Sequence, residues 1–331
     1  MRQINNRLFM VLPCYNEEEV LPETSRRLSE KIRGMISDGT IAENSRILFV
    51  DDGSRDTTWQ LISALCKDDP LFQGVRLAAN RGHQNALLAG LMVASGICDM
   101  AISMDADLQD DIGVIDAMVE KYTAGADIVY GVRSDRKTDS FFKRTTARSF
   151  YKLMHGMGAE TVYDHADFRL MSQRALKALA QYGEVNLFLR GIVPMLGFET
   201  QIVEYSRAKR FAGESKYPLR KMLSFALEGI TSLSVKPIRM ITGLGFGIFM
   251  VSIVVLIYSL VRYFTGHTIP GWTTTVLSVW AIGGLMMISL GVIGEYIGKI
   301  YLESKARPRY LIEEYLGDDT EVDLIDRKGM S

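Results

Sequence analysis

The chain has 331 residues, of which 47% are hydrophobic and 23% charged, and its net charge is −1. This composition excludes an intrinsically disordered chain, and the balanced charge gives no reason to expect a nucleic-acid partner. The three cysteines, Cys14, Cys66 and Cys98, are odd in number and far apart, which argues against a disulfide framework and against a zinc site. Residues 1–13 hold only a short apolar run without a small-residue cleavage site, so we expect no signal peptide.

The first 200 residues alternate short apolar runs with amphipathic stretches. Strands are predicted at residues 8–12, 47–50, 74–77, 100–104 and 128–131, with helices near residues 18–37, 57–67, 84–95 and 112–123. Apolar strands that alternate with helices predict a doubly wound α/β domain. Such domains bind their ligands at the carboxyl ends of the strands.

Three polar motifs follow successive predicted strands: residues 13–17 (Pro-Cys-Tyr-Asn-Glu), 51–54 (Asp-Asp-Gly-Ser) and 105–109 (Asp-Ala-Asp-Leu-Gln). Asp-Gly-Ser alone is ordinary turn chemistry, so the three motifs carry the prediction only together. Asp105 and Asp107 can converge on one hard cation, with Gln109 as a neutral oxygen ligand. Without a cation, two carboxylates a few Å apart repel by ~4 kcal/mol at an effective dielectric of ~20. A divalent ion that also binds a diphosphate relieves this repulsion.

A basic segment precedes the C-terminal third of the chain. Residues 205–240 contain eight Lys or Arg against two Glu. This favours contact with anionic headgroups or phosphates over an ordinary solvated surface. Apolar residues recur at helical spacing between residues 219 and 233, which predicts an amphipathic interfacial helix over residues 218–235. Packing of that helix on the α/β domain is the alternative.

Two apolar segments without charged residues, 240–261 and 272–294, are each long enough to cross a membrane as a helix of ~33 Å. The ten residues between them are too few for a domain, so we expect a transmembrane hairpin over residues 236–298. Lys and Arg flank the outer ends of the hairpin, whereas the loop holds one arginine, Arg262. The positive-inside rule therefore predicts cytoplasmic termini, including a tail over residues 299–331. The lack of charge in the spans argues against a channel or flippase.

These motifs resemble those of inverting family-2 glycosyltransferases with the GT-A (Rossmann-like) fold. More narrowly, the chain is similar to the polyisoprenyl-phosphate glycosyltransferases related to dolichyl-phosphate-mannose synthase, and in particular to the bacterial bactoprenol glucosyltransferases of O-antigen modification. The resemblance covers about residues 7–316. It includes residues 80–84 (Asn-Arg-Gly-His-Gln), 167–171 (Asp-Phe-Arg-Leu-Met), 213–217 (Gly-Glu-Ser-Lys-Tyr), 294–298 (Gly-Glu-Tyr-Ile-Gly) and 306–310 (Ala-Arg-Pro-Arg-Tyr). It implies a GT-A nucleotide-sugar domain over residues 1–217.

The resemblance also implies roles for individual residues. Nucleotide binding is implied for Pro13, Tyr15, Glu17, Asp51, Asp52, Asp105 and Arg133. A Mg²⁺ or Mn²⁺ ion is implied at Asp107, Gln109 and Asp105, and catalysis at Asp167 and Asp105. Contacts to the acceptor phosphate are implied for Arg207, Arg210, Ser215 and Lys216.

Three positions in or beside these motifs leave alternatives open. Arg133 could pair with an acid instead of a phosphate, and His83 could make a structural hydrogen bond instead of touching the donor. Ala166 stands where this branch usually has Gly, which leaves the identity of the sugar less certain.

The reaction implied is the inverting transfer of one hexose, glucose from UDP-glucose, to undecaprenyl phosphate at the cytoplasmic face of the inner membrane. Another sugar (mannose, GlcNAc or amino-arabinose), a processive polysaccharide synthase and a non-catalytic nucleotide-sugar scaffold are the alternatives. None of the three tryptophans follows an arginine, which disfavours the synthase, and the intact aspartates disfavour the scaffold. A homo-oligomer, such as a tetramer, is expected.

Overall fold

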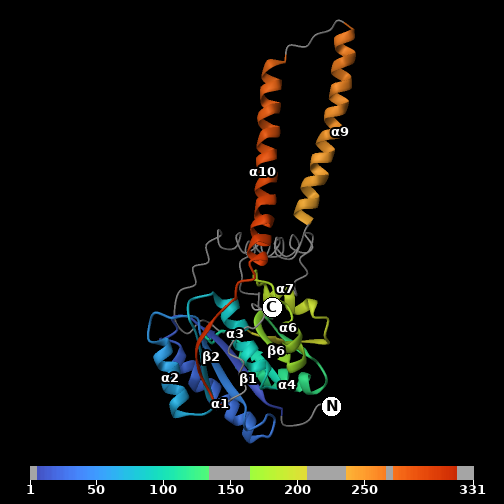
Figure 1. Ribbon diagram of the computed structural model, residues 1–331. Coiled ribbons are helices and arrows are strands. Elements are labelled where there is room, and N and C mark those ends of the chain that lie inside the picture. Colours follow the sequence, from blue (N-terminus) through green and yellow to red (C-terminus); the bar gives the residue numbers. More distant parts are fainter. Residues whose placement is uncertain (1–5, 134–164, 207–235, 266–270, 319–331) are drawn as a thin grey trace. The chain divides into compact units, whose positions relative to one another are not determined.

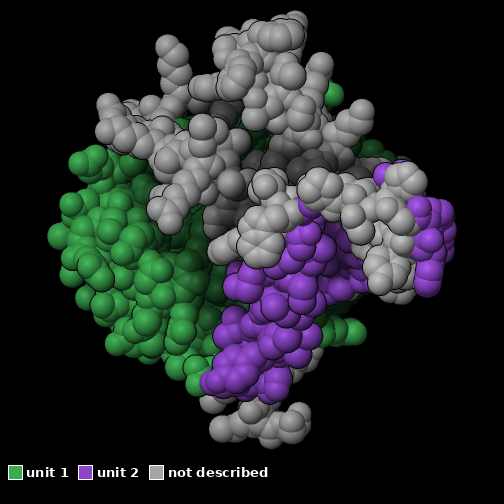
Figure 2. Space-filling view, turned by 90° about the horizontal axis from the view of Figure 1, so that it is seen from above, with its two compact units in different colours: residues 1–151, 160–218, 306–331 green, residues 152–159, 219–305 purple. Residues whose placement is uncertain are grey.

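The computed structural model describes residues 6–133, 165–206, 236–265 and 271–318 (Figure 1). The chain divides into two compact units, which Figure 2 draws in different colours. Unit 1 comprises residues 1–151, 160–218 and 306–331, and unit 2 comprises residues 152–159 and 219–305. The predicted amphipathic helix over residues 218–235 lies outside the described residues.

Unit 1 is built on a mixed sheet of eight strands in the order β7-β5-β6-β4-β1-β2-β3-β8. The strands are β1 (Leu8–Cys14), β2 (Arg46–Asp51), β3 (Phe72–Leu77), β4 (Met100–Ser103), β5 (Ile128–Arg133), β6 (His165–Ser172), β7 (Thr200–Tyr205) and β8 (Ile312–Leu316). β1 pairs in parallel with β2 and β4, and β2 with β3. β6 runs antiparallel between β4 and β5, and β8 runs antiparallel along β3. The carboxyl ends of β1, β2, β3 and β4 therefore meet at one edge of the sheet.

Helices cover both faces of this sheet. They are α1 (Leu21–Ser37), α2 (Thr58–Asp68), α3 (His83–Ser95), α4 (Ile115–Thr123), α6 (Gln173–Leu179) and α7 (Leu189–Met195), with a 3₁₀ turn at Ile112–Val114 before α4. Alternate residues of β1 belong to two separate cores: Met10 and Leu12 pack with α1, α2 and α4, whereas Phe9 and Val11 pack with α3, α6 and α7. The predicted α/β fold is thus confirmed.

α3 packs closely against the sheet where it crosses β1 and β2. A Cβ atom on Gly90 would lie 2.5 Å from Cγ1 of Val11 and 2.6 Å from Cγ2 of Val50. Only a residue without a side chain fits there. This packing fixes the axis of α3, whose first residues reach the carboxyl ends of the parallel strands.

Three strands go beyond those expected from the sequence. β6 carries a fully buried arginine, Arg169, so it does not read as an apolar run. β7 lies at one edge of the sheet with most of its side chains exposed. β8 comes from the segment assigned to a C-terminal tail, and it forms the opposite edge of the sheet.

Unit 2 contains two long apolar helices, α9 (Lys236–Phe264) and α10 (Trp272–Ser304) (Figure 1). Each includes a segment long and apolar enough to cross a membrane, Ile238–Val255 and Ala281–Ser304, with mean hydropathies of 2.0 and 1.5. The predicted spans lie within these helices, and α10 continues past residue 294 to Ser304. Large apolar side chains are exposed along both, including Phe246, Val254 and Met287.

Candidate functional site

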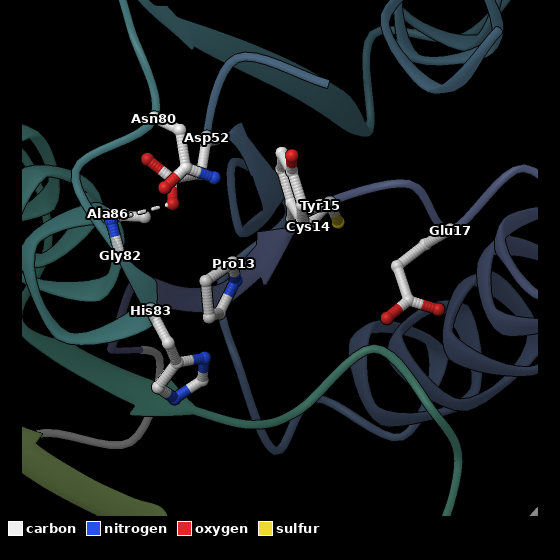
Figure 3. Close-up of a pocket in the computed structure, with 9 residues that line it drawn as sticks. All are labelled: Pro13, Cys14, Tyr15, Glu17, Asp52, Asn80, Gly82, His83 and Ala86. Atoms are coloured by element: carbon white, nitrogen blue, oxygen red, sulfur yellow. Dashed lines mark hydrogen bonds between the residues drawn. The ribbon is translucent and has the colours of Figure 1, made fainter. Parts of the chain in front are cut away.

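A pocket of about 350 Å³ opens at the carboxyl ends of the first three strands. Its lining residues are Pro13, Cys14, Tyr15, Glu17, Asp52, Asn80, Gly82, His83 and Ala86 (Figure 3). In Figure 3, Glu17 lies on one side of Pro13, and Asp52 and Asn80 lie on the other. Two motifs that lie far apart in sequence therefore supply residues to one cavity: Pro13, Tyr15 and Glu17 from the first, and Asp52 from the second.

Two buried aspartates at the end of β2 accept hydrogen bonds from backbone N–H groups. Asp51 accepts from the Ser54 N–H, 3.2 Å from Oδ1. Asp52 accepts from the N–H groups of Arg81, at 2.7 Å, and Gly82, at 2.9 Å. Burial raises the pKa of both carboxyls, and these N–H donors oppose the rise. Asp52 thereby holds the loop before α3 against the end of β2.

The left-handed residue of the β2 loop explains why that loop contains glycine. Gly53 has φ of 67°, and a Cβ atom there would lie 2.9 Å from the backbone nitrogen of Asn80. The β2 loop and the loop before α3 can approach so closely only because this side chain is missing.

The Asp-x-Asp loop after β4 lies near the pocket through His83, a pocket residue whose Nε2 is 3.5 Å from Oδ1 of Asp105. Asp107 and Gln109 are both buried, and the Gln109 N–H lies 3.2 Å from Oδ1 of Asp107. Among the described residues, Oδ1 of Asp105 has no hydrogen-bond partner, although Nε2 of His83 is 3.5 Å away. Burial raises the pKa of Asp105 to about 6, against the effect of His83 and with that of the neighbouring aspartates.

These groups fit a hard divalent cation, because two carboxylates and an amide are all oxygen donors and one buried oxygen lacks a hydrogen bond. In the part of the chain that the structure describes, three or more His, Cys, Asp or Glu residues do not gather as a metal site. The predicted set therefore depends on Asp105, Asp107 and the amide of Gln109.

Asp167, in β6, is surrounded by cationic side chains. Its Oδ2 lies 3.0 Å from Nη2 of Arg190 and 3.5 Å from Nε2 of His83. Its Oδ1 lies 3.3 Å from Nη2 of Arg169. Although burial favours the neutral acid, Arg190, His83 and Arg169 hold the pKa of Asp167 well below its usual range. Burial lowers the pKa of His83, but Asp167 and Asp105 together raise it above its usual value.

Arg190 was not predicted from the sequence. It lies in α7, more than twenty residues after Asp167, outside every quoted motif. Only the fold brings it to the site, because the side chain of Gln84 accepts a hydrogen bond from the Leu189 N–H at 2.9 Å and so joins the start of α7 to the first turn of α3.

Arg133 ends β5 and contacts an acid, as its alternative reading proposed. Its Nη2 lies 3.3 Å from Oδ1 of the buried Asp110, and its Nε lies 3.2 Å from the Tyr205 hydroxyl. Tyr205 in turn donates to Asp110. These three residues link the loop after β4 to the ends of β5 and β7. The predicted acceptor residues Arg207, Arg210, Ser215 and Lys216 lie outside the described residues.

Comparison with known proteins identifies the family. Residues 10–180, more than half of the chain, match the family described as glycosyl transferase family 2. The chain belongs to glycosyl transferase family 2, and it is a glycosyltransferase. The predicted family, enzyme class and GT-A type of fold are thereby confirmed.

Relatives match almost the entire chain. It is 54% identical to the uncharacterized glycosyltransferase YkoT of Bacillus subtilis, over 95% of this chain and 93% of that protein. It is 40% identical to the bactoprenol glucosyl transferase of Shigella phage SfV, over 93% of this chain and 98% of that protein. Among solved structures, mannosyl-3-phosphoglycerate synthase from Rubrobacter xylanophilus matches with a TM-score of 0.47 at 14% identity, over 72% of this chain and 75% of that one.

Proposed function

We propose that this glycosyltransferase transfers one glucose from UDP-glucose to undecaprenyl phosphate, inverting the anomeric carbon, at the cytoplasmic face of the inner membrane. The product would be a lipid-linked sugar for O-antigen or cell-envelope glycosylation. The observation that carries the proposal is the extent of the match to the bactoprenol glucosyl transferase, 93% of this chain. The unmatched remainder is shorter than either α9 or α10, so the similarity includes the sheet and the apolar helices alike.

The pocket at the end of β1 is the proposed site of the donor nucleotide. Its volume of about 350 Å³ is at the lower end of the range for small-molecule sites. Tyr15 is 41% exposed, so its ring is available to stack on a base, and Pro13 and Glu17 also line the pocket. Asp51 and Asp52 shape the adjoining loops through their backbone hydrogen bonds.

Asp105, Asp107 and Gln109 are the proposed ligands of Mg²⁺ or Mn²⁺. When bound, such a cation would stabilise the negative charge on the departing diphosphate. This chain contributes an oxygen-rich loop in which Asp107 and Gln109 are buried and the Gln109 N–H donates to Asp107.

Asp167 is proposed to orient reacting groups, with proton removal a minor part of its role. A phosphate monoester has a second pKa of ~6, so most of the acceptor is a dianion at neutral pH and has no proton to lose. A carboxylate whose pKa lies well below its usual range is also a weak base at that pH. Both arguments favour Asp167 as a group that orients its cationic neighbours and accepts hydrogen bonds from donor hydroxyls.

The helices of unit 2 are the proposed membrane anchor. Their exposed apolar side chains suit a hydrocarbon environment, and their length suits a bilayer. We propose that the hairpin places both termini in the cytoplasm, that Arg207, Arg210, Ser215 and Lys216 meet the acceptor phosphate, and that the enzyme is a homo-oligomer. Cysteines introduced at Gly266 or Thr268 should react with an impermeant thiol reagent from the periplasmic side, whereas a cysteine at Ser54 should not. Equal protection of these positions would contradict the hairpin.

The proposed reaction is tested with purified enzyme, undecaprenyl phosphate and a panel of radiolabelled donors: UDP-glucose, UDP-GlcNAc, GDP-mannose and UDP-amino-arabinose. We expect label to enter the lipid from UDP-glucose and the Asp107→Asn variant to be nearly inactive. Transfer from another donor alone would refute glucose, and failure to label the lipid with every donor would refute the acceptor. Growth of a long polymer would indicate a processive synthase.

A further inference from the structure

Among the described residues, three cationic side chains contact the carboxylate of Asp167, and one of these three contacts both of its oxygens. Arg190 places Nη2 at 3.0 Å from Oδ2 and Nε at 3.3 Å from Oδ1. Arg169 contacts Oδ1 alone, and His83 contacts Oδ2 alone. A guanidinium that binds two oxygens fixes the plane of a carboxylate as well as its charge.

The three neighbours are also held in different ways. Arg169 is fully buried in β6, and within the described part of the chain its Nε and Nη1 have no hydrogen-bond partner. Asp167 is therefore the counter-ion on which this buried charge depends. His83 is shared between Asp167 and Asp105. Arg190 is 36% exposed at its side chain, and its removal leaves the buried Asp167 paired with Arg169 and His83.

The helix that carries Arg190, α7, is held in place by its packing and by a hydrogen bond. Leu189, Ile192 and Val193 of α7 are buried in the same core as α3. The hydrogen bond from the Leu189 N–H to Gln84 joins α7 to the residue next to His83. Arg190 and His83 therefore approach Asp167 from two helices that are tied to each other.

We propose that Arg190 is a positioning residue for glycosyl transfer, whose two-point contact holds the Asp167 carboxylate in one orientation toward His83 and Asp105. The inference rests on the proposed role of Asp167 in transfer. Groups that are already oriented need no rearrangement as the reaction proceeds, so the loss of this contact should lower turnover and leave substrate binding nearly unchanged.

The first test compares Arg190→Lys and Arg190→Gln with wild type. Arg190→Gln should lower kcat by ~10²-fold, the size of effect expected when a reacting group is misplaced, with both KM values within about twofold of wild type. Arg190→Lys keeps the charge but cannot form the two-point contact, so it should recover only part of the loss. A rise in the KM of the lipid acceptor at normal kcat would overturn the proposal, because Arg190 would then bind the acceptor phosphate directly.

The matched control is Arg174, which pairs with the buried Asp127 in the same unit. Asp127 precedes β5, so this pair lies at the end of the strand opposite Arg133 and away from the site. Arg174→Gln leaves Asp127 with the hydrogen bond from the Ser172 hydroxyl, so the variant should transfer sugar at the wild-type rate per folded molecule. An equal loss in Arg174→Gln and Arg190→Gln would mean that breaking any such ion pair is damaging, and the proposal would fail.

A double-variant cycle decides whether Arg190 acts through Asp167. If it does, the Asp167→Asn, Arg190→Gln double variant should be no slower per folded molecule than Asp167→Asn alone. The folded fraction of each variant is measured by circular dichroism, because Asp167→Asn leaves the buried Arg169 without its counter-ion. If the two losses multiply instead, Arg190 acts independently and the proposal is wrong. The cycle uses whichever donor and acceptor the wild type accepts. If glucose or the lipid is the wrong assignment, the wild-type result with that substrate changes. If the role proposed for Arg190 is wrong, only the comparison among the variants changes. Should Arg190→Gln fail to fold, Arg190→Lys serves in the same cycle.

Discussion

The site has two halves: a backbone-bonded half at the end of β2, and a paired half formed by the loop after β4 and by β6. Both halves contain buried aspartates, but the partners of these aspartates differ. At the end of β2, Asp51 and Asp52 accept hydrogen bonds from backbone N–H groups of nearby loops, and Nε of Arg76 lies farther away, 3.9 Å from Oδ2 of Asp51. Asp110 and Asp167, after β4 and in β6, face the side chains of arginines, a tyrosine and a histidine. The first kind of contact fixes the course of the backbone, whereas the second fixes functional groups relative to one another. Neutralising an aspartate should therefore have different consequences in the two halves.

Asp105 and Asp107, the proposed cation ligands, combine both kinds of contact: Asp107 accepts from the Gln109 N–H, and Asp105 faces His83, although Oδ1 of Asp105 has no hydrogen bond among the described residues. If this loop binds a cation, Asp107→Asn should reduce turnover by ~10²–10³-fold with little loss of stability, because an amide brings no negative charge to the metal. Activity of the wild type should disappear in EDTA and return with Mn²⁺ or Mg²⁺. Asp116→Asn, which breaks only an exposed pair with Lys31, is the control and should be near normal. Full activity in the chelator would contradict the metal assignment.

The second prediction concerns the half in which side chains pair. Asp167→Asn should be impaired by a similar factor, ~10²-fold or less, from pH 7 to pH 9. The cationic neighbours keep the pKa of Asp167 low, so it is ionised throughout this range and its contribution should not change with pH. Single-turnover transfer measured for both proteins across the range decides the matter. Rescue of the variant by tenfold or more at high pH would instead identify Asp167 as a general base, since alkali would then ionise the remaining acceptor in its place.

The sequence predicted the backbone-bonded half better than the paired half. The strands β1 to β5 are short apolar runs, and the motifs at their ends lie within a few residues of the side chains that line the pocket. Such local patterns are visible in one dimension. Arg190 leaves no such signal, because it reaches Asp167 only through the packing of α7 on α3.

The missed strands have the same kind of explanation. β6 holds a buried arginine whose charge is compensated by Asp167, so hydropathy alone does not mark it as a central strand. β8 follows α10 by a short segment, and its pairing with β3 crosses more than two hundred residues of sequence. A motif can report that residues matter, as residues 167–171 do, without reporting which distant residue they contact.

The third prediction tests the backbone-bonded half. Asp52→Asn leaves only one oxygen to face the N–H groups of Arg81 and Gly82, so we expect a loss of about 1–3 kcal/mol in the free energy of unfolding. The KM of the donor should rise several-fold as the loop before α3 loosens, whereas kcat should change less. Thermal unfolding in detergent and donor titrations measure these quantities. An unchanged stability with a raised KM would show that Asp52 touches the nucleotide instead of shaping the loop.

The smallest predicted effect concerns Tyr205, whose hydroxyl donates to Asp110 and accepts from Nε of Arg133. Burial and Asp110 raise the pKa of the phenol, so the hydroxyl stays protonated and remains a donor. Tyr205→Phe removes this one hydroxyl, and Asp110 keeps Arg133 as a partner. A lost hydrogen bond of about 0.5–1.5 kcal/mol corresponds to a change of roughly 2–10-fold in an equilibrium.

Asp110 directly follows Gln109, a proposed metal ligand. We therefore expect Tyr205→Phe to weaken Mn²⁺ binding by roughly 2–10-fold, measured by electron paramagnetic resonance in the presence of UDP. Tyr315→Phe is the matched control, because it removes a hydroxyl that contacts Gln73 at 3.1 Å on the opposite edge of the sheet. It should leave Mn²⁺ affinity unchanged. Equal affinities for wild type and Tyr205→Phe would mean that the link among Asp110, Tyr205 and Arg133 supports the sheet without orienting the cation loop. The contrast between the two halves would then be confined to Asp167 and its neighbours.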